Sequence, residues 1–459
     1  MTNYYKLGCH WGRGNPDFFD ILITHSIIIC AEWEMEPGDI VAVTNGFDVI
    51  ALACITENRI PVTQRPELQE VFVKKQIPYE DWIYIASAKI WSLDDNYRFE
   101  YKSQKGIHQI RRPDIIDKIN SLLNQKHDTE MIDKLKNLLI ANHNLILTGA
   151  PGTGKTFLAK KIAEALGATG TSCKLVQFHP SFDYTDFVEG LRPVCNNEQL
   201  GFERKDGIFK DFCKKAYAAV VRQQIGAEYF KVYEEVKKGK LTGIPIAKGN
   251  KTIFCGENEK WGLTTGQMRK TGKPGDIVYL DTIEKVINSG FVNRTALENY
   301  TQGLRDIPGV GGNISDLRYA MYFLFGRIEN KKDTIPSDSQ KYVFIIDEIN
   351  RGEISKIFGE LFFSIDVGYR GVKGRVNTQY QNLVKEDDIF HDGFFIPENV
   401  YIIGTMNDID RSVEAMDFAM RRRFAWKEIT AKSRQSMLDS EDAWGENQKP
   451  NQETIEEIK

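Results

Sequence analysis

Eight consecutive residues have the pattern of a phosphate-binding loop: Gly149-Ala150-Pro151-Gly152-Thr153-Gly154-Lys155-Thr156. An apolar segment, residues 145–147, precedes the loop and a helical pattern follows it, which is the context that this pattern requires. The glycines let backbone N–H groups surround phosphates, and the following helix adds the positive end of its dipole. Lys155 is expected to contact the β- and γ-phosphates, and the Thr156 hydroxyl to bind Mg²⁺. The loop therefore predicts a site for a nucleoside triphosphate and Mg²⁺.

Two consecutive carboxylates, Asp347 and Glu348, follow directly after the apolar run at residues 342–346. A strand that ends beside a phosphate site explains why both acids stand there. Asp347 is expected to hold Mg²⁺, and Glu348 to act as the general base on the attacking water. The structural alternative is that they cap the helix that follows.

A third group of polar residues follows the apolar run at 400–403. Asn407 at the end of this strand can orient the water that attacks the phosphate. Further on, three consecutive arginines, Arg421-Arg422-Arg423, end a helical pattern. They suit the negative end of the helix dipole, or one of them reaches the γ-phosphate of a neighbouring subunit as an arginine finger.

Alternating helices and strands must position these residues, and they begin at Ile132. This alternation predicts an α/β fold with a parallel sheet over residues 132–429. Strands are expected at 145–147, 174–178, 342–346 and 400–403. The segment from about 225 to 330 has a different rhythm and is predicted to be an insertion, and residues 430–459 a partial lid or a disordered tail.

The first 112 residues have a different pattern. Short β-branched and aromatic runs, separated by turn sequences such as Glu36-Pro37-Gly38-Asp39, predict strands at 40–43, 49–53, 71–73 and 82–86. Several short strands at this spacing predict a separate small β-barrel. Residues 113–131 are predicted to be a linker, a short helix followed by a polar connector.

Composition limits the remaining possibilities. The 459 residues carry a formal net charge of −4, so the chain is not a generally basic protein that coats DNA. Seven scattered cysteines indicate neither a disulfide framework nor a zinc site. No apolar run approaches the ~20 residues of a bilayer span, and the N-terminus lacks the apolar core of a signal peptide. The sequence thus predicts a cytoplasmic, multidomain protein without a membrane partner.

As a set, these motifs resemble the McrB motor subunits of modification-dependent, type IV restriction systems. The resemblance rests on the loop and on four further stretches, residues 178–182, 347–352, 406–412 and 421–424. It covers roughly 132–429 without the insertion, and it implies an AAA+ P-loop NTPase fold and assembly into a hexameric ring. It also implies a preference for GTP, with ATP as the alternative nucleotide, and a separate McrC-type endonuclease as partner.

The same resemblance assigns roles to single residues. It implies that Asn407 and Asp410 position the water. It makes Arg422 the finger that acts in trans, with Arg423 beside it as the next candidate. The chain departs from the family pattern at Asp408-Ile409, where a Thr-Ala pair is usual.

The N-terminal region resembles PUA-like modules such as EVE domains, which bind a flipped, modified base in an aromatic pocket. The likeness rests on Trp11-Gly12, the Pro37-Gly38-Asp39 turn and the strand spacing. It implies modified DNA as a partner, and aromatic stacking on an extruded base gives it a physical basis. The candidate pocket residues are Trp11, Trp33, Phe47 and Trp82, and each of them is alternatively a core residue.

Two other functions fit the same motifs. The chain could be an AAA+ ATPase of the MoxR or dynein-related type that remodels proteins. It could also be a nucleotide-gated scaffold whose N-terminal domain docks a protein. Nucleotide competition would test the first alternative, and binding of a modified oligonucleotide would test the second.

Overall fold

The structure is a computed structural model that describes residues 2–9, 17–30, 34–196, 199–241, 244–246, 249–251, 253–255, 262–265, 276–298, 301–311, 314–329, 339–407 and 418–430. It divides into two compact units, one built on Met1–Met131 and one on Ile132–Gln435. Within the described ranges, no helix combines the length and the apolar composition needed to cross a bilayer.

The N-terminal unit contains one mixed sheet in the order β2-β6-β4-β3-β1-β8, in which β1 pairs parallel with β3 and the other neighbours are antiparallel. Two short strands, β5 and β7, pair with β6 and β4. The bounds are β1 Tyr4–Gly8, β2 Ile27–Ile29, β3 Ile40–Asn45, β4 Asp48–Ile55, β5 Ile60–Pro61, β6 Tyr84–Ser92, β7 Phe99–Glu100 and β8 Ile107–Gln109. The β-rich unit agrees with the prediction, but the pairings among described residues form an open path, so they do not close the expected barrel.

Both faces of this sheet are covered, because its strands are apolar at successive positions. Val41 and Val43 of β3 pack with Phe72 in one apolar core, which also includes α1 (Phe19–His25). Ala42 of the same strand faces a second core, which contains Ile119. The alternation of side chains along a strand produces these two layers.

The strand predicted at residues 71–73 is wrong, since these residues lie in the helix α2 (Gln69–Lys74). Leu68 and Phe72, one helical turn apart, are both fully buried, whereas Val73 is 64% exposed. Burial follows the period of a helix and not the alternation of a strand. A short β-branched run hides this difference in the sequence.

The segment predicted as a linker is part of one helix of 30 residues, α3 (Pro113–Asn142). Ile115 and Ile119 in its first turns belong to the core of the N-terminal unit. Leu135 and Leu139 near its end are also buried. The polar connector expected after a short helix is therefore helical, and the boundary between the two units falls inside α3.

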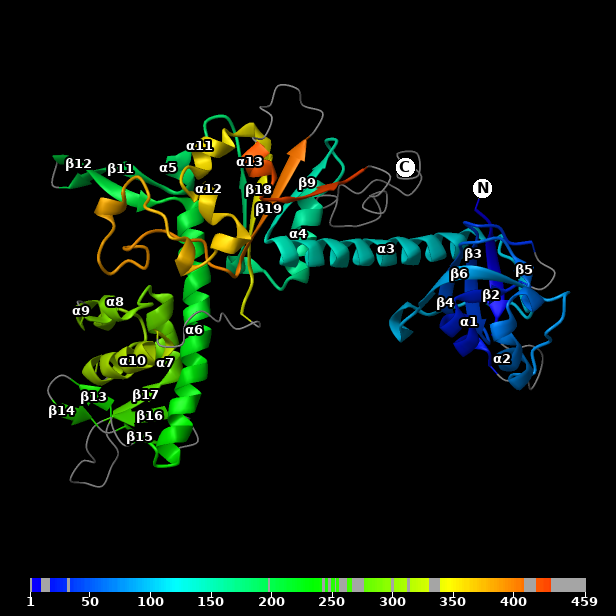
Figure 1. The fold of residues 1–459 in the computed structure, drawn as a ribbon, viewed down its shortest axis with the longest axis horizontal. Helices are drawn as coiled ribbons and strands as arrows, with labels where there is room; N and C mark the ends of the chain where they lie inside the picture. The colour runs from blue at the N-terminus through cyan, green and yellow to red at the C-terminus, as the bar shows by residue number, and fades with distance from the viewer. Residues whose placement is uncertain are drawn as a thin grey trace. The chain divides into compact units, whose positions relative to one another are not determined.

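The second unit is built on a five-stranded parallel sheet in the order β10-β18-β19-β9-β20 (Figure 1). Its central strands are almost continuously buried, as expected for a parallel sheet with both faces covered. The strands are β9 Asn144–Gly149, β10 Cys173–Gln177, β18 Tyr342–Asp347, β19 Val400–Asn407 and β20 Ala425–Glu428. The helices around them are α4 Lys155–Ala165, α5 Tyr184–Phe187, α11 Ile354–Phe358, α12 Leu361–Ser364 and α13 Phe418–Arg421.

A long helix, α6 (Ile208–Lys237), connects this sheet to the insertion (Figure 1). Its first half contributes Phe209 and Phe212 to the core of the sheet, and its second half contributes Ile225 and Tyr229 to another core. An antiparallel hairpin, β11 (Glu189–Asn196) and β12 (Gln199–Asp206), precedes it. The insertion holds β13 Ile244–Ile246, β14 Gly249–Lys251, β15 Ile253–Cys255, β16 Gly262–Thr265, β17 Asp276–Tyr279, α7 Leu280–Asn288, α8 Arg294–Glu298, α9 Thr301–Arg305 and α10 Ile314–Glu329.

Candidate functional site

The phosphate-binding loop joins the end of β9 to the start of α4, and its glycines are required by the backbone. Gly149 has φ +147°, and a Cβ there would lie 2.2 Å from the carbonyl oxygen of Ile429. Gly152 and Gly154 have φ +80° and +76°, in the left-handed region that glycine enters without strain. Lys155 Nζ donates to the carbonyl oxygens of Gly149, at 2.9 Å, and of Ala150, at 2.7 Å. The side chain of Lys155 therefore folds back onto the phosphate-binding loop.

Asp347 ends β18 next to the loop and shares one carboxylate oxygen between two hydroxyl groups. Thr156 Oγ1 and Thr405 Oγ1 each donate to Asp347 Oδ1 at 2.6 Å. A carboxylate and a threonine hydroxyl are oxygen ligands of the kind that Mg²⁺ prefers, and magnesium usually keeps several waters and phosphate oxygens besides. The donor set that the structure gathers at Thr156 and Asp347 therefore fits a nucleotide-bound Mg²⁺.

Glu348 turns away from the strand in the left-handed region, with φ +53°. Such a conformation is uncommon for a residue other than glycine and is often found at functional sites. Its backbone N–H donates to Thr405 Oγ1 at 3.2 Å, and its Oε1 accepts a hydrogen bond from Asn407 Nδ2. Arg351 Nε lies 3.5 Å from its Oε2. The structure thus brings Glu348 and Asn407 together at the ends of neighbouring strands.

Two residues contribute to this site that had no individual role in the sequence-based prediction. Thr405 links Asp347 to the backbone of Glu348, as described above. Asn350 Nδ2 donates to the carbonyl oxygen of Asn407 at 3.2 Å. The alternation along β19 carries a signal for Thr405, because residues two apart on a strand share a face and Thr405 is two residues before Asn407.

The three arginines lie at the opposite edge of the sheet from the loop. Ala425, just beyond them, is in register with Leu145 at the start of β9, and Gly149 ends that strand. Five residue-to-residue steps along the strand lead from Asn144 to Gly149, a distance of about 17 Å. This exceeds the length of an extended arginine side chain, so none of the three can reach a phosphate bound at the loop of its own chain.

The structure also distinguishes the three arginines from one another. Arg421 stacks over the ring of Trp426, at 5.0 Å from the centroid. Arg423 lies over the ring of Phe362, at 4.3 Å, and its Nη1 donates to a backbone carbonyl one helical turn earlier. Arg422 is exposed, and its side chain makes no hydrogen bond or ion pair with any residue that the structure describes.

Of the remaining predicted residues, the structure describes only Phe47 and Trp82, and it does not bring these two together. Asp410, Trp11 and Trp33 lie outside the described residues. Phe47, in the turn between β3 and β4, and Trp82, just before β6, are both about half exposed. Because β4 and β6 are antiparallel and Ala51 pairs with Ser92, at the end of β6, these two aromatic side chains lie at opposite ends of the sheet. They cannot line one small pocket together.

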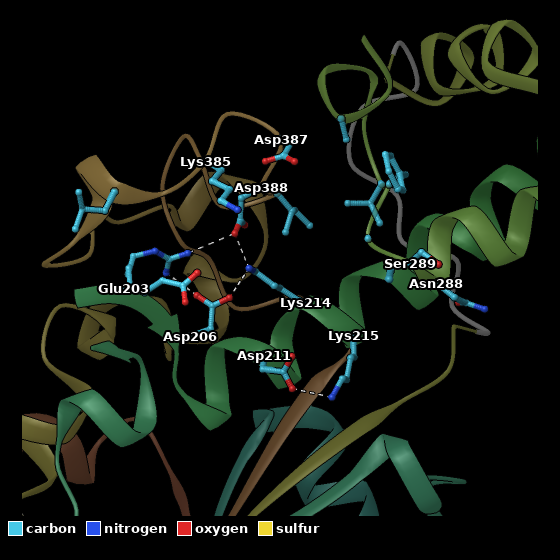
Figure 2. Close-up of a pocket in the computed structure, with 18 of the residues that line it drawn as sticks. Glu203, Asp206, Asp211, Lys214, Lys215, Asn288, Ser289, Lys385, Asp387 and Asp388 are labelled. Atoms are coloured by element: carbon cyan, nitrogen blue, oxygen red, sulfur yellow. Dashed lines mark hydrogen bonds and ion pairs between the residues drawn. The ribbon is translucent and has the colours of Figure 1, made fainter. Parts of the chain in front are cut away.

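A cavity of about 730 Å³ lies elsewhere in the second unit, between β12, α6, the loop around Asp388 and the turn that follows α7 (Figure 2). Its wall carries ion pairs, among them Lys214 with Asp206 and with Asp388, the latter at 2.5 Å. Burial raises the pKa of Asp206, but the positive charges of Lys214 and Arg204 lower it by more. The pKa of Asp206 is therefore below its ordinary value. These ion pairs connect the hairpin, through Asp206, and the loop, through Asp388, to Lys214 of α6. We therefore interpret these charged residues as structural.

Comparison with known proteins shows which family the second unit is similar to. A family model for the AAA domain of the dynein-related subfamily matches residues 144–239 and 315–424, which leaves out most of the insertion. These residues are therefore similar to an AAA domain, and the parallel sheet and the loop are consistent with the α/β fold of P-loop NTPases.

The relatives come from restriction systems and from helicases. The chain is 28% identical over 317 residues to the type IV methyl-directed restriction enzyme EcoKMcrB subunit of Escherichia coli K12, which is 68% of this chain and 40% of that protein. It is 26% identical over 212 residues to the type II restriction enzyme BsuMI component YdiS of Bacillus subtilis, 45% of this chain and 56% of that one. RuvB-like helicase 1 of Drosophila melanogaster is 26% identical over 171 residues, 36% of this chain and 33% of the helicase. The chain thus spans 40% to 56% of the two restriction proteins that it matches.

Proposed function

We propose, from the premise that this chain carries an AAA domain similar to that of McrB, that it is the nucleotide-hydrolysing motor subunit of a modification-dependent restriction system. The proposal that the chain hydrolyses a nucleotide rests on one observation: Lys155, Asp347 and Glu348 lie together at a single edge of the parallel sheet. The restriction part rests on the two bacterial relatives. The proposal includes a preference for GTP over ATP, which is what the resemblance to McrB-type motors implies.

In this mechanism the chain's own groups bind the nucleotide and move one proton. Backbone N–H groups of the loop bind the phosphates, and Lys155 exchanges its two carbonyl acceptors for phosphate oxygens. Thr156 and Asp347 would hold Mg²⁺, which neutralises the charge on the phosphates when it is bound. Glu348 accepts a proton from the attacking water, and Asn407, which already donates to Glu348, holds this water and the carboxylate in line.

The site is completed by a second copy of the chain. Arg422 cannot reach the phosphates of its own subunit, and its exposed side chain is available to a neighbour. A ring in which each Arg422 contacts the next subunit's γ-phosphate satisfies both observations. A hexameric ring is the form that the resemblance implies, with an McrC-type endonuclease as the partner that cleaves DNA.

The experiment that tests the motor uses the full chain and an McrC-type endonuclease on modified duplex DNA. We expect cleavage only when both proteins and hydrolysable GTP are present, and none with the Lys155→Ala chain. A nucleotide competition assay on the full chain separates the alternatives, because we expect a protein-remodelling ATPase of the dynein-related type to prefer ATP. Cleavage without nucleotide hydrolysis would contradict the proposal.

The N-terminal unit is proposed to read the modified base. Phe47 and Trp82 lie at opposite ends of the sheet, so at most one of them belongs to the pocket. The full-length Phe47→Ala and Trp82→Ala chains therefore serve as controls for each other. We expect the wild-type chain to bind modified duplex at least several-fold more tightly than unmodified duplex, since an aromatic contact to a base contributes ~1–3 kcal/mol. Equal binding of all duplexes by the wild-type chain would overturn this role.

A further inference from the structure

A buried polar group lies at the starting edge of the parallel sheet, away from the phosphate-binding loop. Asn144, the first residue of β9, is fully buried. Its Nδ2 donates to two backbone carbonyl oxygens, that of Ile365 at 3.0 Å and that of Arg423 at 2.9 Å. Its Oδ1 accepts from Arg370 Nη2 at 2.6 Å. One side chain thus connects three segments that are far apart in the sequence.

Arg370 is itself 1% exposed, which is unusual for an arginine. Its Nε donates to the carbonyl of Ile365 at 3.0 Å, and its Nη1 has no hydrogen-bond partner among the described residues. Burial lowers its pKa to about 10. Burying a cation whose described partners are only a carbonyl and an amide is costly, because neither partner carries an opposite charge. The group is better explained by the geometry that it imposes than by stability.

These bonds fix part of the arginine segment, residues 421–423. Asn144 holds the carbonyl of Arg423, and Trp426 Nε1 donates to the carbonyl of Arg421 at 2.8 Å. The backbone is therefore fixed on both sides of Arg422, while the Arg422 side chain remains exposed. A side chain that must reach a neighbouring subunit profits from such a fixed base, because its reach depends on where its backbone lies.

We propose that Asn144, held by Arg370, is a positioning residue that presents Arg422 to the nucleotide of the next subunit. The inference rests on the proposed function, in which Arg422 acts in trans. Asn144 and Arg370 are both buried at the starting edge, away from the loop, so both act only through the backbone of the arginine segment. The damage caused by their loss should therefore appear in the site of the neighbouring subunit.

Subunit mixing tests this directly. Asn144→Ala should lower the rate of hydrolysis at least tenfold while changing the affinity for nucleotide less than threefold. Mixed with Lys155→Ala, which lacks a working loop but retains Arg422, it should recover activity well above the mean of the two separate proteins. Mixed with Arg422→Ala it should recover none, because both chains then lack a positioned arginine.

A matched control exists in the neighbouring strand. Asn399 is buried just before β19, and its Nδ2 also donates to two backbone carbonyls, those of Ala216 and Gln340, each at 3.0 Å. It has no contact with the arginine segment among the described bonds. Asn399→Ala should hydrolyse nucleotide within threefold of the wild-type rate, so a loss of stability alone does not reproduce the effect.

The outcomes separate the positioning role of Asn144 from the shared site itself. If Asn144→Ala is rescued by Arg422→Ala and not by Lys155→Ala, the loop of its own subunit is damaged and the positioning role is refuted. If Asn144→Ala does not fold, Asn144→Asp keeps the acceptor for Arg370, removes the donor to Arg423, and must show the same pattern. If Arg422→Ala and Lys155→Ala fail to rescue each other, the shared site itself is wrong, whatever Asn144 does.

Discussion

The two edges of the parallel sheet use polar side chains in opposite ways. Where the strands end, Lys155 bonds to carbonyls of its own loop and Glu348 bonds to Asn407. Where the strands begin, Asn144 and Arg370 bond to backbone carbonyls and to each other inside the core. The bonds at the first edge can be exchanged for bonds to a nucleotide. Those at the second edge are inaccessible and fix the chain.

This difference follows from the topology. In a parallel α/β sheet the helices that follow the strands begin at the edge where the strands end, so N–H groups and helix dipoles gather there and attract phosphates. The starting edge receives helix ends and loops, whose carbonyls need donors. Asn144 supplies two such bonds and Asn399 another two. The proposed nucleotide site at one edge and the fixed backbone around Arg422 at the other are thus both compatible with one fold.

The largest expected effect concerns the arginine at the starting edge. Arg422→Ala should lower turnover by about 10³–10⁵-fold, the range for loss of an arginine finger. Arg423→Ala is the matched control, since the Arg423 side chain is occupied by Phe362 and a backbone carbonyl, and it should cost stability more than turnover. Steady-state hydrolysis and thermal unfolding of both variants measure this. A larger kinetic loss in Arg423→Ala would transfer the finger role to Arg423.

At the other edge, Glu348→Gln should lower turnover by about 10²–10⁴-fold, because an amide cannot accept the proton of the attacking water. Binding of nucleotide with Mg²⁺ should persist, since Glu348 does not contact the loop in the described bonds. Single-turnover hydrolysis and equilibrium binding separate these effects. Turnover within twofold of the wild type would remove Glu348 from the mechanism.

Thr405→Val should have a smaller effect at the same edge. It removes the hydroxyl that donates to Asp347 and accepts from the backbone of Glu348. A hydrogen bond to a charged group contributes ~1.5–3 kcal/mol, so turnover should fall by about 10–100-fold and more Mg²⁺ should be needed for half-maximal rate. Thr405→Ser retains the hydroxyl and should restore both values, and equal rates for both variants would exclude this role.

The smallest effect is one of stability at the starting edge. Burial, and the charge of Arg370, lower the pKa of His143 from 6.5 to about 4, and its ring stacks on Tyr401 at 4.8 Å. The neutral imidazole is therefore favoured in the folded state, so stability is complete above pH 6.5 and declines as the pH falls towards 4. Between pH 7 and pH 5 the loss should be about 2 kcal/mol.

Denaturant midpoints at these two pH values measure the contribution of His143. His143→Asn is the control, because asparagine tolerates the φ of +58° at this position and does not titrate. This variant should lose distinctly less stability than the wild type over the same interval. An equal loss in both proteins would assign the pH dependence to other groups.

Sequence patterns predicted four of the five strands of the parallel sheet, and β9, β18 and β19 among them are almost entirely apolar runs buried on both faces. The patterns missed the strand β20, because its residues Ala425–Glu428 are half polar and only partly buried. They failed where the run was ambiguous. Residues 71–73 read as a strand but form part of α2, since the burial of Leu68 and Phe72 selects the helical period. Residues 113–131 read as a helix and a connector but belong to α3, because Ile115 and Ile119 pack against the sheet. Contacts that are distant in the sequence decided both.

For the site, the sequence by itself determined which chemistry is available: the loop ending in Lys155-Thr156, and the carboxylates of Asp347 and Glu348, have few uses other than nucleotide hydrolysis. Only the tertiary structure decided which hydroxyl, Thr405, joins the two acids, and which of three adjacent arginines is free. It also placed Arg422 at the edge of the sheet far from its own loop. A motif specifies the types and order of side chains, whereas the distance between motifs is fixed by how the strands pair and what the core buries around them.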